Sequence, residues 1–300
     1  DELYFSANDG TNGQELWVYD GTNATMVQDI RSGSANSSPS SLTVFNDELY
    51  FSANDGTNGR ELWVYDGTNA TMVQDIRSGS NSSDPYSLTV FNDKLYFGAT
   101  DRTNGQELWV YDGTNATLVQ DIRSGSDPSN PNSLTVFNDK LYFKANDGTN
   151  GTELWVYDGT NATMVQDINS GSTSSSPFWL TVFNDKLFFS ADDGTNGTEL
   201  WVYDGTNATL VQDIRSGSGG SGPAHLIVFN SMLYFGANDG ANGGNNGELW
   251  VYDGTNATLV QDISPSAGSY PSDLTVFNNK LFYSAEDGVN GQELWSLAAA

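Results

Sequence analysis

A repeating unit of 46 residues runs through the sequence, and it constrains the fold more than any other feature. Each unit carries a Glu-Leu-Trp motif, so the copies can be aligned on their tryptophans. A spacing in this range is typical of repeat architectures, in which one supersecondary unit buries its apolar surface against its neighbours. There are six full units and a partial seventh, and the last two steps change in length because of an insertion at 241–247 and a shortened segment before Leu274. The recurring residues are Trp17, Trp63, Trp109, Trp155, Trp201, Trp250 and Trp295.

Each unit contains four short apolar runs that favour β-strands. Apolar and polar residues alternate within a run with a period near two, and no helical period occurs in the sequence. A two-residue link, Asn46 and Asp47, separates the first two runs and suits a tight hairpin, because Asn and Asp tolerate positive φ. Turns rich in Gly and Asn separate the others. In one unit the runs span 42–45, 49–51, 61–65 and 71–76.

The longest connection in each unit follows the fourth run, and all eight prolines fall in these connections. Proline cannot donate a hydrogen bond to a β-ladder, so these segments mark where one meander ends and the chain crosses to the next sheet. Each unit is therefore predicted to be one antiparallel sheet of four strands.

The fold class that follows is all-β, and the architecture is a β-propeller. A single meander has two apolar faces, and radial stacking buries each face against a neighbouring blade. An open β-solenoid is the alternative, although its repeats are usually shorter and parallel. Residues 1–300 form one propeller domain in this interpretation.

The number of blades depends on the two ends of the sequence, which begins on the second strand of one blade and ends on the third strand of another. We favour seven blades, in which the first and last lack one strand each. A six-bladed ring with a surplus hairpin is the alternative. Because the sequence opens at Asp1 inside the repeat, we expect a processed or partial chain, with any targeting segment upstream.

The composition excludes several classes of function. The chain has 38 acidic and 11 basic residues and a formal net charge of -27, which repels nucleic acid and anionic membrane surfaces. No apolar run approaches the roughly 18 residues that span a bilayer. There is no cysteine and only one histidine, His225, so thiol chemistry and multi-histidine metal sites are excluded. We therefore predict neither nucleic acid binding nor membrane insertion.

The sequence Leu-Tyr-Phe-Ser-Ala-x-Asp-Gly-x-x-Gly-x-Glu-Leu-Trp-x-x-Asp-Gly-Thr resembles the ELWxxDGT repeat of large bacterial and some eukaryotic surface proteins. It recurs over essentially the whole chain, first with Glu15, Leu16, Trp17, Asp20 and Gly21, and only the seventh unit is reduced to Glu-Leu-Trp. The resemblance implies an extracellular, propeller-like module without catalytic residues. The relatives commonly continue with Glu-Ala-Gly-Thr, whereas this chain has Asn-Ala-Thr.

The loop between the second and third runs is a candidate calcium site. It places carboxylate and amide oxygens at close spacing, as hard cations require. The competing interpretation is that Asp and Asn satisfy turn backbone groups while Gly supplies positive φ. Ca2+ is the only cofactor predicted. The candidate ligands are Asp9, Asn12, Glu15, Asp55, Asn58, Glu61, Asp147, Asn150, Glu153, Asp193, Asn196 and Glu199.

Asn-Ala-Thr is also an acceptor sequence for N-glycosylation, and it lies beside the predicted outer hairpin turn of six units. These six positions are Asn23, Asn69, Asn115, Asn161, Asn207 and Asn256. Further acceptor sequences occur at Asn36, Asn81, Asn150 and Asn196. We predict a glycoprotein on this basis, with a plain Asn-rich turn as the competing interpretation.

The tryptophans of the motif could stack on sugars, but both faces of their strand are expected to be buried between blades. Trp179 is the exception, because it breaks the repeat at the start of a first strand, and it is the best candidate for a local ligand contact near the ring surface. Paired carboxylates recur equally in every unit, so no single pocket is distinguished by them. No enzymatic activity is predicted.

Together these features predict an extracellular or cell-surface structural or adhesive propeller, a repeating component of a surface layer, sheath or filament. Near-identical blades present the same surface at each step, and incomplete blades can exchange strands with a neighbour. Its partners would be further copies of itself, or other surface proteins and glycans. The alternative is a multivalent, lectin-like propeller that gains strength by avidity.

Overall fold

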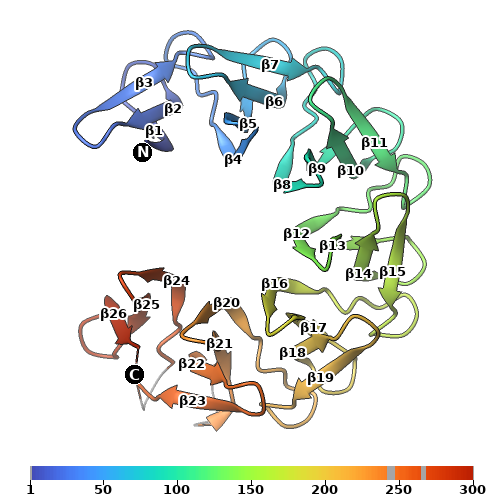
Figure 1. The fold of residues 1–300 in the computed structure, drawn as a ribbon, viewed down its shortest axis with the longest axis vertical. Coiled ribbons are helices and arrows are strands. Elements are labelled where there is room, and N and C mark those ends of the chain that lie inside the picture. The colour runs from blue at the N-terminus through green and yellow to red at the C-terminus, as the bar shows by residue number, and fades with distance from the viewer. Residues whose placement is uncertain (1, 242–246, 265–267, 300) are drawn as a thin grey trace. The chain divides into compact units, whose positions relative to one another are not determined.

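The computed structural model describes residues 2–241, 247–264 and 268–299 (Figure 1). Its 26 strands form seven antiparallel sheets, each built from strands that follow one another in the chain. Five sheets have four strands, and the first (β1–β3) and last (β24–β26) have three. The insertion expected at 241–247 lies largely outside the described residues. No helix among the described residues is long and apolar enough to cross a membrane.

The strands occupy equivalent positions in every repeat. The first strand of a sheet is β4 (Ser40–Phe45), β8 (Tyr86–Phe91), β12 (Asn132–Phe137), β16 (Phe178–Phe183), β20 (Ala224–Phe229) or β24 (Ser272–Phe277). The second is β1 (Leu3–Asn8), β5 (Glu48–Asn54), β9 (Lys94–Thr100), β13 (Lys140–Asn146), β17 (Lys186–Asp192), β21 (Met232–Asn238) or β25 (Lys280–Glu286).

The third strand carries the Glu-Leu-Trp motif, and the fourth carries the Asn-Ala-Thr run. The third strands are β2 (Gln14–Tyr19), β6 (Arg60–Tyr65), β10 (Gln106–Tyr111), β14 (Thr152–Tyr157), β18 (Thr198–Tyr203), β22 (Gly247–Tyr252) and β26 (Gln292–Ala298). The fourth strands are β3 (Ala24–Gln28), β7 (Ala70–Gln74), β11 (Ala116–Gln120), β15 (Ala162–Gln166), β19 (Ala208–Gln212) and β23 (Ala257–Gln261).

The predicted hairpin between the first and second strands is confirmed. Asn46 and Asp47 have φ values of 52° and 63°, and Phe45 pairs with Glu48 across the turn. Positive φ at both central residues gives the turn the backbone twist that suits two antiparallel strands. A second feature was not predicted, because Ser41 has φ 56° and the register shifts between Ser40 and Thr43. Each first strand therefore begins with a bulge.

Each hydrophobic core forms between consecutive sheets. In one cluster, Leu200 of β18 packs with Leu233 and Phe235 of β21 and with Trp250 of β22. The motif tryptophans of β6, β10, β14, β18 and β22 are 7% or 8% exposed, which agrees with the expectation that both faces of this strand are covered. The cores account for the alternation of the sequence, because successive side chains of a strand point to opposite faces.

Contacts between residues divide the chain into two compact units. One comprises mainly residues 1–134 and the other mainly residues 163–300, and the boundary runs through the sheet of β12–β15. Each unit contains complete sheets with cores between them. The organisation of both as a single domain stays a prediction.

Candidate functional site

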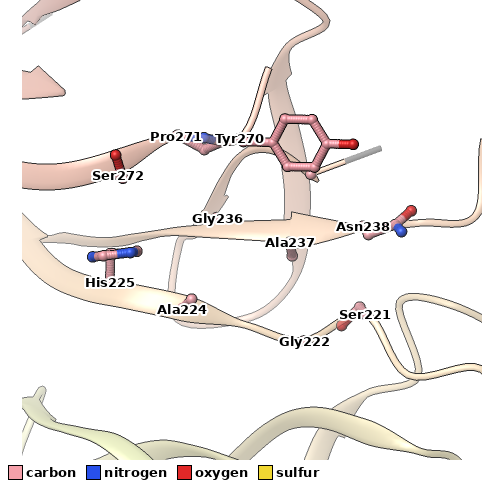
Figure 2. A pocket seen from close by; sticks show the side chains of 11 residues that line it. Ser221, Gly222, Ala224, His225, Gly236, Ala237, Asn238, Tyr270, Pro271 and Ser272 are labelled. Carbon is pink, nitrogen blue, oxygen red and sulfur yellow. The ribbon is translucent and has the colours of Figure 1, made fainter. Parts of the chain in front are cut away.

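A cavity lies in the sixth repeat, in the second unit (Figure 2). Its volume is about 290 Å³, and residues of β20, β21 and β22 line it together with the segment that leads into β24. Sequence reasoning did not identify this site. Its lining includes Ala224, His225, Gly236, Gly247, Tyr270 and Pro271.

The cavity exists because small residues coincide at three positions. Ala224 pairs with Gly236 across β20 and β21, and Gly247 is the first residue of β22. A Cβ atom on Gly236 would lie 3.2 Å from Pro271 Cγ, so the cavity wall at Gly236 has little room for a larger residue. The other repeats carry larger residues at the positions of Ala224 and Gly247, although one of them also has a glycine, Gly98, at the position of Gly236. The coincidence of three small residues in one repeat is the sequence signal that could have revealed the site.

Trp179 lies next to the cavity through its contact with His225. The two ring centroids are 4.3 Å apart, with 36° between the planes. Both residues occupy the bulge position of their strand, with φ values of 58° and 56°. Trp179 is half-buried against the core of β16–β23 rather than exposed as expected, because the bulge turns it toward the next sheet. Phe178 meets it edge to face at 5.4 Å, and Lys144 Nζ lies 4.1 Å from the Phe178 ring centroid.

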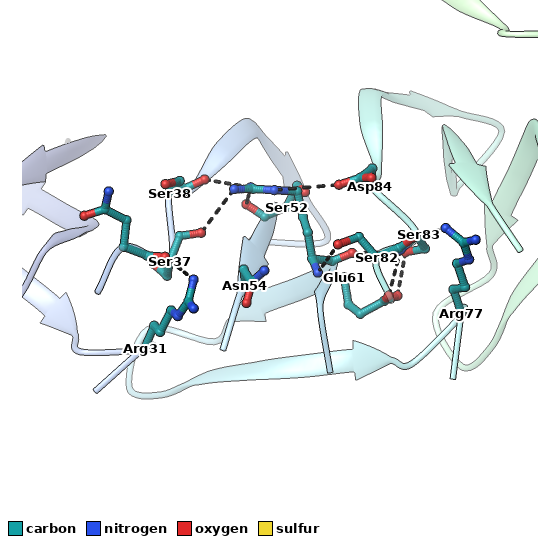
Figure 3. A network of polar contacts seen from close by, with 12 residues as sticks. Arg31, Ser37, Ser38, Ser52, Asn54, Glu61, Arg77, Ser82, Ser83 and Asp84 are labelled. Atoms are coloured by element: carbon teal, nitrogen blue, oxygen red, sulfur yellow. Dashed lines mark hydrogen bonds and ion pairs between the residues drawn. The ribbon is translucent and has the colours of Figure 1, made fainter. Parts of the chain in front are cut away.

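The motif glutamate binds the connection between sheets and is fully buried (Figure 3). One carboxylate oxygen of Glu61 accepts hydrogen bonds from Ile76 N at 3.0 Å and Ser83 Oγ at 2.5 Å, and the other accepts from Ser83 N at 2.9 Å. Burial raises the pKa of Glu61 to about 7, although these three hydrogen bonds act to lower it. The same contacts recur at Glu15, Glu107, Glu153, Glu199 and Glu248.

The aspartates of the predicted calcium loops stabilise their own turns. Asp9 Oδ1 accepts hydrogen bonds from the backbone N–H groups of Thr11 and Asn12, both at 2.8 Å, and Oδ2 accepts one from Asn12 Nδ2 at 2.7 Å. Asp55 with Asn58 and Asp193 with Asn196 repeat this arrangement. These hydrogen bonds lower the pKa of Asp9.

The structure therefore brings the loop Asp and Asn together at Asp9, Asp55 and Asp193, while it commits the motif Glu to the connection that follows the fourth strand. Across the described residues, no three side chains of Asp, Glu or His are grouped so that they could hold a metal ion. Calcium binding by these loops stays a prediction.

The candidate glycosylation sites fall into two groups. The asparagines of all six Asn-Ala-Thr sequences are exposed beside the turn between third and fourth strands, as is the threonine two residues later. In the second group, two asparagine side chains form hydrogen bonds within the protein. Asn36 Oδ1 accepts one from Gln14 N, and Asn196 Nδ2 donates one to Asp193. The Ser83 hydroxyl required for modification of Asn81 is buried against Glu61, and Asn150 is half-buried. Glycosylation stays a prediction, and the exposed group is where we expect it.

No family model and no curated protein matches the sequence. Among solved structures, the chain is similar to the β-propeller domain of the Trilobed protease from Pyrococcus furiosus, with 12% identity, a TM-score of 0.57, and coverage of 100% of this chain and 92% of that one. A prolyl endopeptidase gives 11% identity, a TM-score of 0.64, and coverage of 98% and 48%. A puromycin-hydrolyzing peptidase of Mycobacterium tuberculosis gives 9% identity, a TM-score of 0.59, and coverage of 100% and 50%.

These similarities confirm the β-propeller fold, and the seven sheets agree with the favoured count of seven blades. Identity of this order establishes the fold alone. The chain spans about half the length of the prolyl endopeptidase and of the puromycin-hydrolyzing peptidase.

The comparisons also correct the predicted function. The similar structures belong to peptidases, so the prediction of a structural or adhesive surface component and its lectin-like alternative are wrong. The prediction of a protein without enzymatic character is wrong for the same reason. The first prediction rested on the equivalence of the blades, and the second on finding no catalytic group in the repeats.

Proposed function

We propose that this chain is the non-catalytic propeller of a peptidase, a module that receives peptide substrates for a separate catalytic domain. The proposal rests on how the chain aligns with peptidase structures. Nearly the whole chain aligns with the prolyl endopeptidase and with the puromycin-hydrolyzing peptidase, but it covers only about half of each of those proteins. We place the hydrolytic groups in another part of the enzyme, because the chain has no cysteine and its one histidine, His225, lies against the Trp179 ring with 4.3 Å between the ring centroids.

The cavity supports a role in receiving substrate. Binding sites are usually concave and largely apolar, with a few polar groups that fix orientation. This cavity combines Tyr270 and His225 with the backbone of Gly222 and Gly236. It also lies where one repeat differs in sequence from its near-identical neighbours, as a defined peptide orientation would require.

The expected location and relatives also enter here as proposals. The exposed Asn-Ala-Thr sequences and the acidic composition favour an extracellular enzyme, and the Glu-Leu-Trp motifs favour kinship with the ELWxxDGT-repeat proteins. Neither is required for the peptidase role.

The test uses protein purified from its native source through an antibody against this chain. We expect the purified material to hydrolyse a proline-containing peptide or puromycin, the substrates that the names of the similar enzymes indicate. Residues 1–300 produced alone serve as the control and should hydrolyse neither. Hydrolysis by residues 1–300 alone would contradict a non-catalytic role, and inactive native material would contradict the link to peptidases.

A further inference from the structure

Arg60, the first residue of β6, occupies in another repeat the position that Gly247 occupies beside the cavity. Its Nη1 donates hydrogen bonds to the backbone oxygens of Ser38 at 2.7 Å and Ser52 at 3.3 Å, and Nη2 donates to that of Ser37 at 3.4 Å. Its Nε lies 3.9 Å from a carboxylate oxygen of Asp84. These acceptors are labelled in Figure 3. A cleft of backbone oxygens in this repeat therefore accommodates a half-buried guanidinium group.

The residues that Arg60 contacts have their counterparts around the cavity. The strand registers correspond, because Asn54 pairs with Arg60 and Asn238 pairs with Gly247. Gly247 has no side chain to place in the cleft, so the space that a guanidinium fills in one repeat is open in the other. The counterparts that line the cavity are Ser221 for Ser37, Gly222 for Ser38, Gly236 for Ser52 and Tyr270 for Asp84.

A third repeat fills the position in a different way. Tyr86 pairs with Gly98 across β8 and β9, and its ring covers that glycine so closely that a Cβ atom there would collide with it. The cavity repeat keeps a glycine at the second position, Gly236, but has Ala224 where the tyrosine would be. The sixth repeat thus has neither the arginine that fills this space in the β4–β7 sheet nor the tyrosine that fills it in the β8–β11 sheet.

We propose that the cavity binds the guanidinium group of an arginine side chain presented by a peptide or protein. The arginine would enter where Gly247 leaves space and would donate to the backbone oxygens that correspond to those used by Arg60. This site does not depend on the proposed peptidase role, because it can be measured on the chain alone.

The chemistry of the cavity favours guanidinium over other cations. Guanidinium is planar and has five N–H donors in a fixed arrangement that can reach several oxygens together, whereas ammonium is a compact and more strongly hydrated charge. Tyr270 stands where Asp84 stands in the other repeat, and an aromatic face attracts a guanidinium group through a cation–π contact. The net charge of -27 adds a general attraction for cations.

The test is a calorimetric titration of the chain with N-acetyl-arginine amide. We expect saturable binding to one site, and at least tenfold weaker binding of N-acetyl-citrulline amide, which keeps the shape but loses the charge. Tenfold corresponds to about 1.4 kcal/mol. Absence of saturable binding, or equal binding of the two compounds, would overturn the proposal.

Two variants that fill the cavity locate the site. In Gly247→Arg the protein's own guanidinium should take the place of the ligand, and a Cβ atom at 247 has room because its nearest contact is 3.5 Å away on Tyr270. Ala224→Tyr recreates the tyrosine-over-glycine pair of β8 and β9, so it decides the matter if the first variant fails to fold. Both should abolish binding, whereas Gln292→Arg, which adds the same charge on the exposed start of β26, should not. Wild-type binding by either folded filling variant would show that the ligand binds elsewhere.

Discussion

Glu61 illustrates how a residue's partners decide its role. It lies in the third strand, yet its carboxylate serves Ser83 and Ile76 in the segment that follows the fourth strand. Its position near Asp55 and Asn58 in the sequence favoured a calcium ligand, because spacing along the chain shows which residues are neighbours but not which way a side chain points. Ser83 is 22 residues farther along the chain, and no periodicity of a strand or turn predicts that it contacts Glu61.

Replacement of Glu61 by alanine should destabilise the protein strongly. The change removes three hydrogen bonds to a buried carboxylate, although Ser83 N and Ser83 Oγ keep Arg60 O as an acceptor. Hydrogen bonds to charged groups contribute about 1.5–3 kcal/mol each. We expect a loss of about 3 kcal/mol or more in the free energy of unfolding, measured by chemical denaturation.

Glu293→Ala is the matched control for this change. Glu293 occupies the same motif position in β26 but is exposed, so its loss should change the free energy by no more than about 0.5 kcal/mol. Equal effects of the two substitutions would show that the buried hydrogen bonds of Glu61 do not stabilise the fold.

Strand order and type could be predicted from the period-two pattern, and the details that failed have local causes. The fourth run was expected to extend through Ile76, but β7 ends at Gln74 because Ile76 N donates to Glu61 instead of to a neighbouring strand. The first strand begins at Ser40, two residues before the predicted start, because a bulge at Ser41 lets the chain resume pairing. Apolar alternation cannot show either event, since the first depends on a hydrogen bond to the Glu61 side chain and the second on a positive φ at Ser41.

The fourth strands are joined between sheets by a glutamine side chain that pairs with the backbone as a strand would. Gln166 Nε2 donates to Ala208 O at 3.3 Å, and Ala208 N donates to Gln166 Oε1 at 3.1 Å. Gln28, Gln74, Gln120 and Gln212 make the same two contacts with the next sheet. This contact supplements the apolar cores in holding neighbouring sheets together.

Replacement of Gln166 by alanine should cost about 1 kcal/mol, since two hydrogen bonds are lost at a half-buried position. Gln261→Ala changes the same repeat position in β23, where the glutamine is exposed, and should have little effect. Thermal unfolding of the two variants measures the difference. If Gln261→Ala lowers the melting temperature as much as Gln166→Ala does, the contact with Ala208 has no stabilising role.

Across the whole chain, repetition made the fold predictable and the function hard to see. Six near-identical units and a partial seventh indicated a propeller, but averaging over them concealed the positions where one unit differs. Ala224, Gly236 and Gly247 are unremarkable in isolation, and together they leave a cavity only because the strands bring them to one place. The predicted surface component assumed equivalent blades, and the similarity to peptidases overturned it.

In the proposed site, the side chain at the start of the third strand decides which repeat binds a ligand. Calorimetric stoichiometry with N-acetyl-arginine amide measures this directly. Wild-type protein should bind one equivalent, and Arg60→Gly should bind two because it opens the cleft of Ser37, Ser38 and Ser52. The double variant Arg60→Gly/Gly247→Arg should again bind one equivalent, now in the β4–β7 sheet. A stoichiometry of one for Arg60→Gly, in protein that remains folded, would contradict the account.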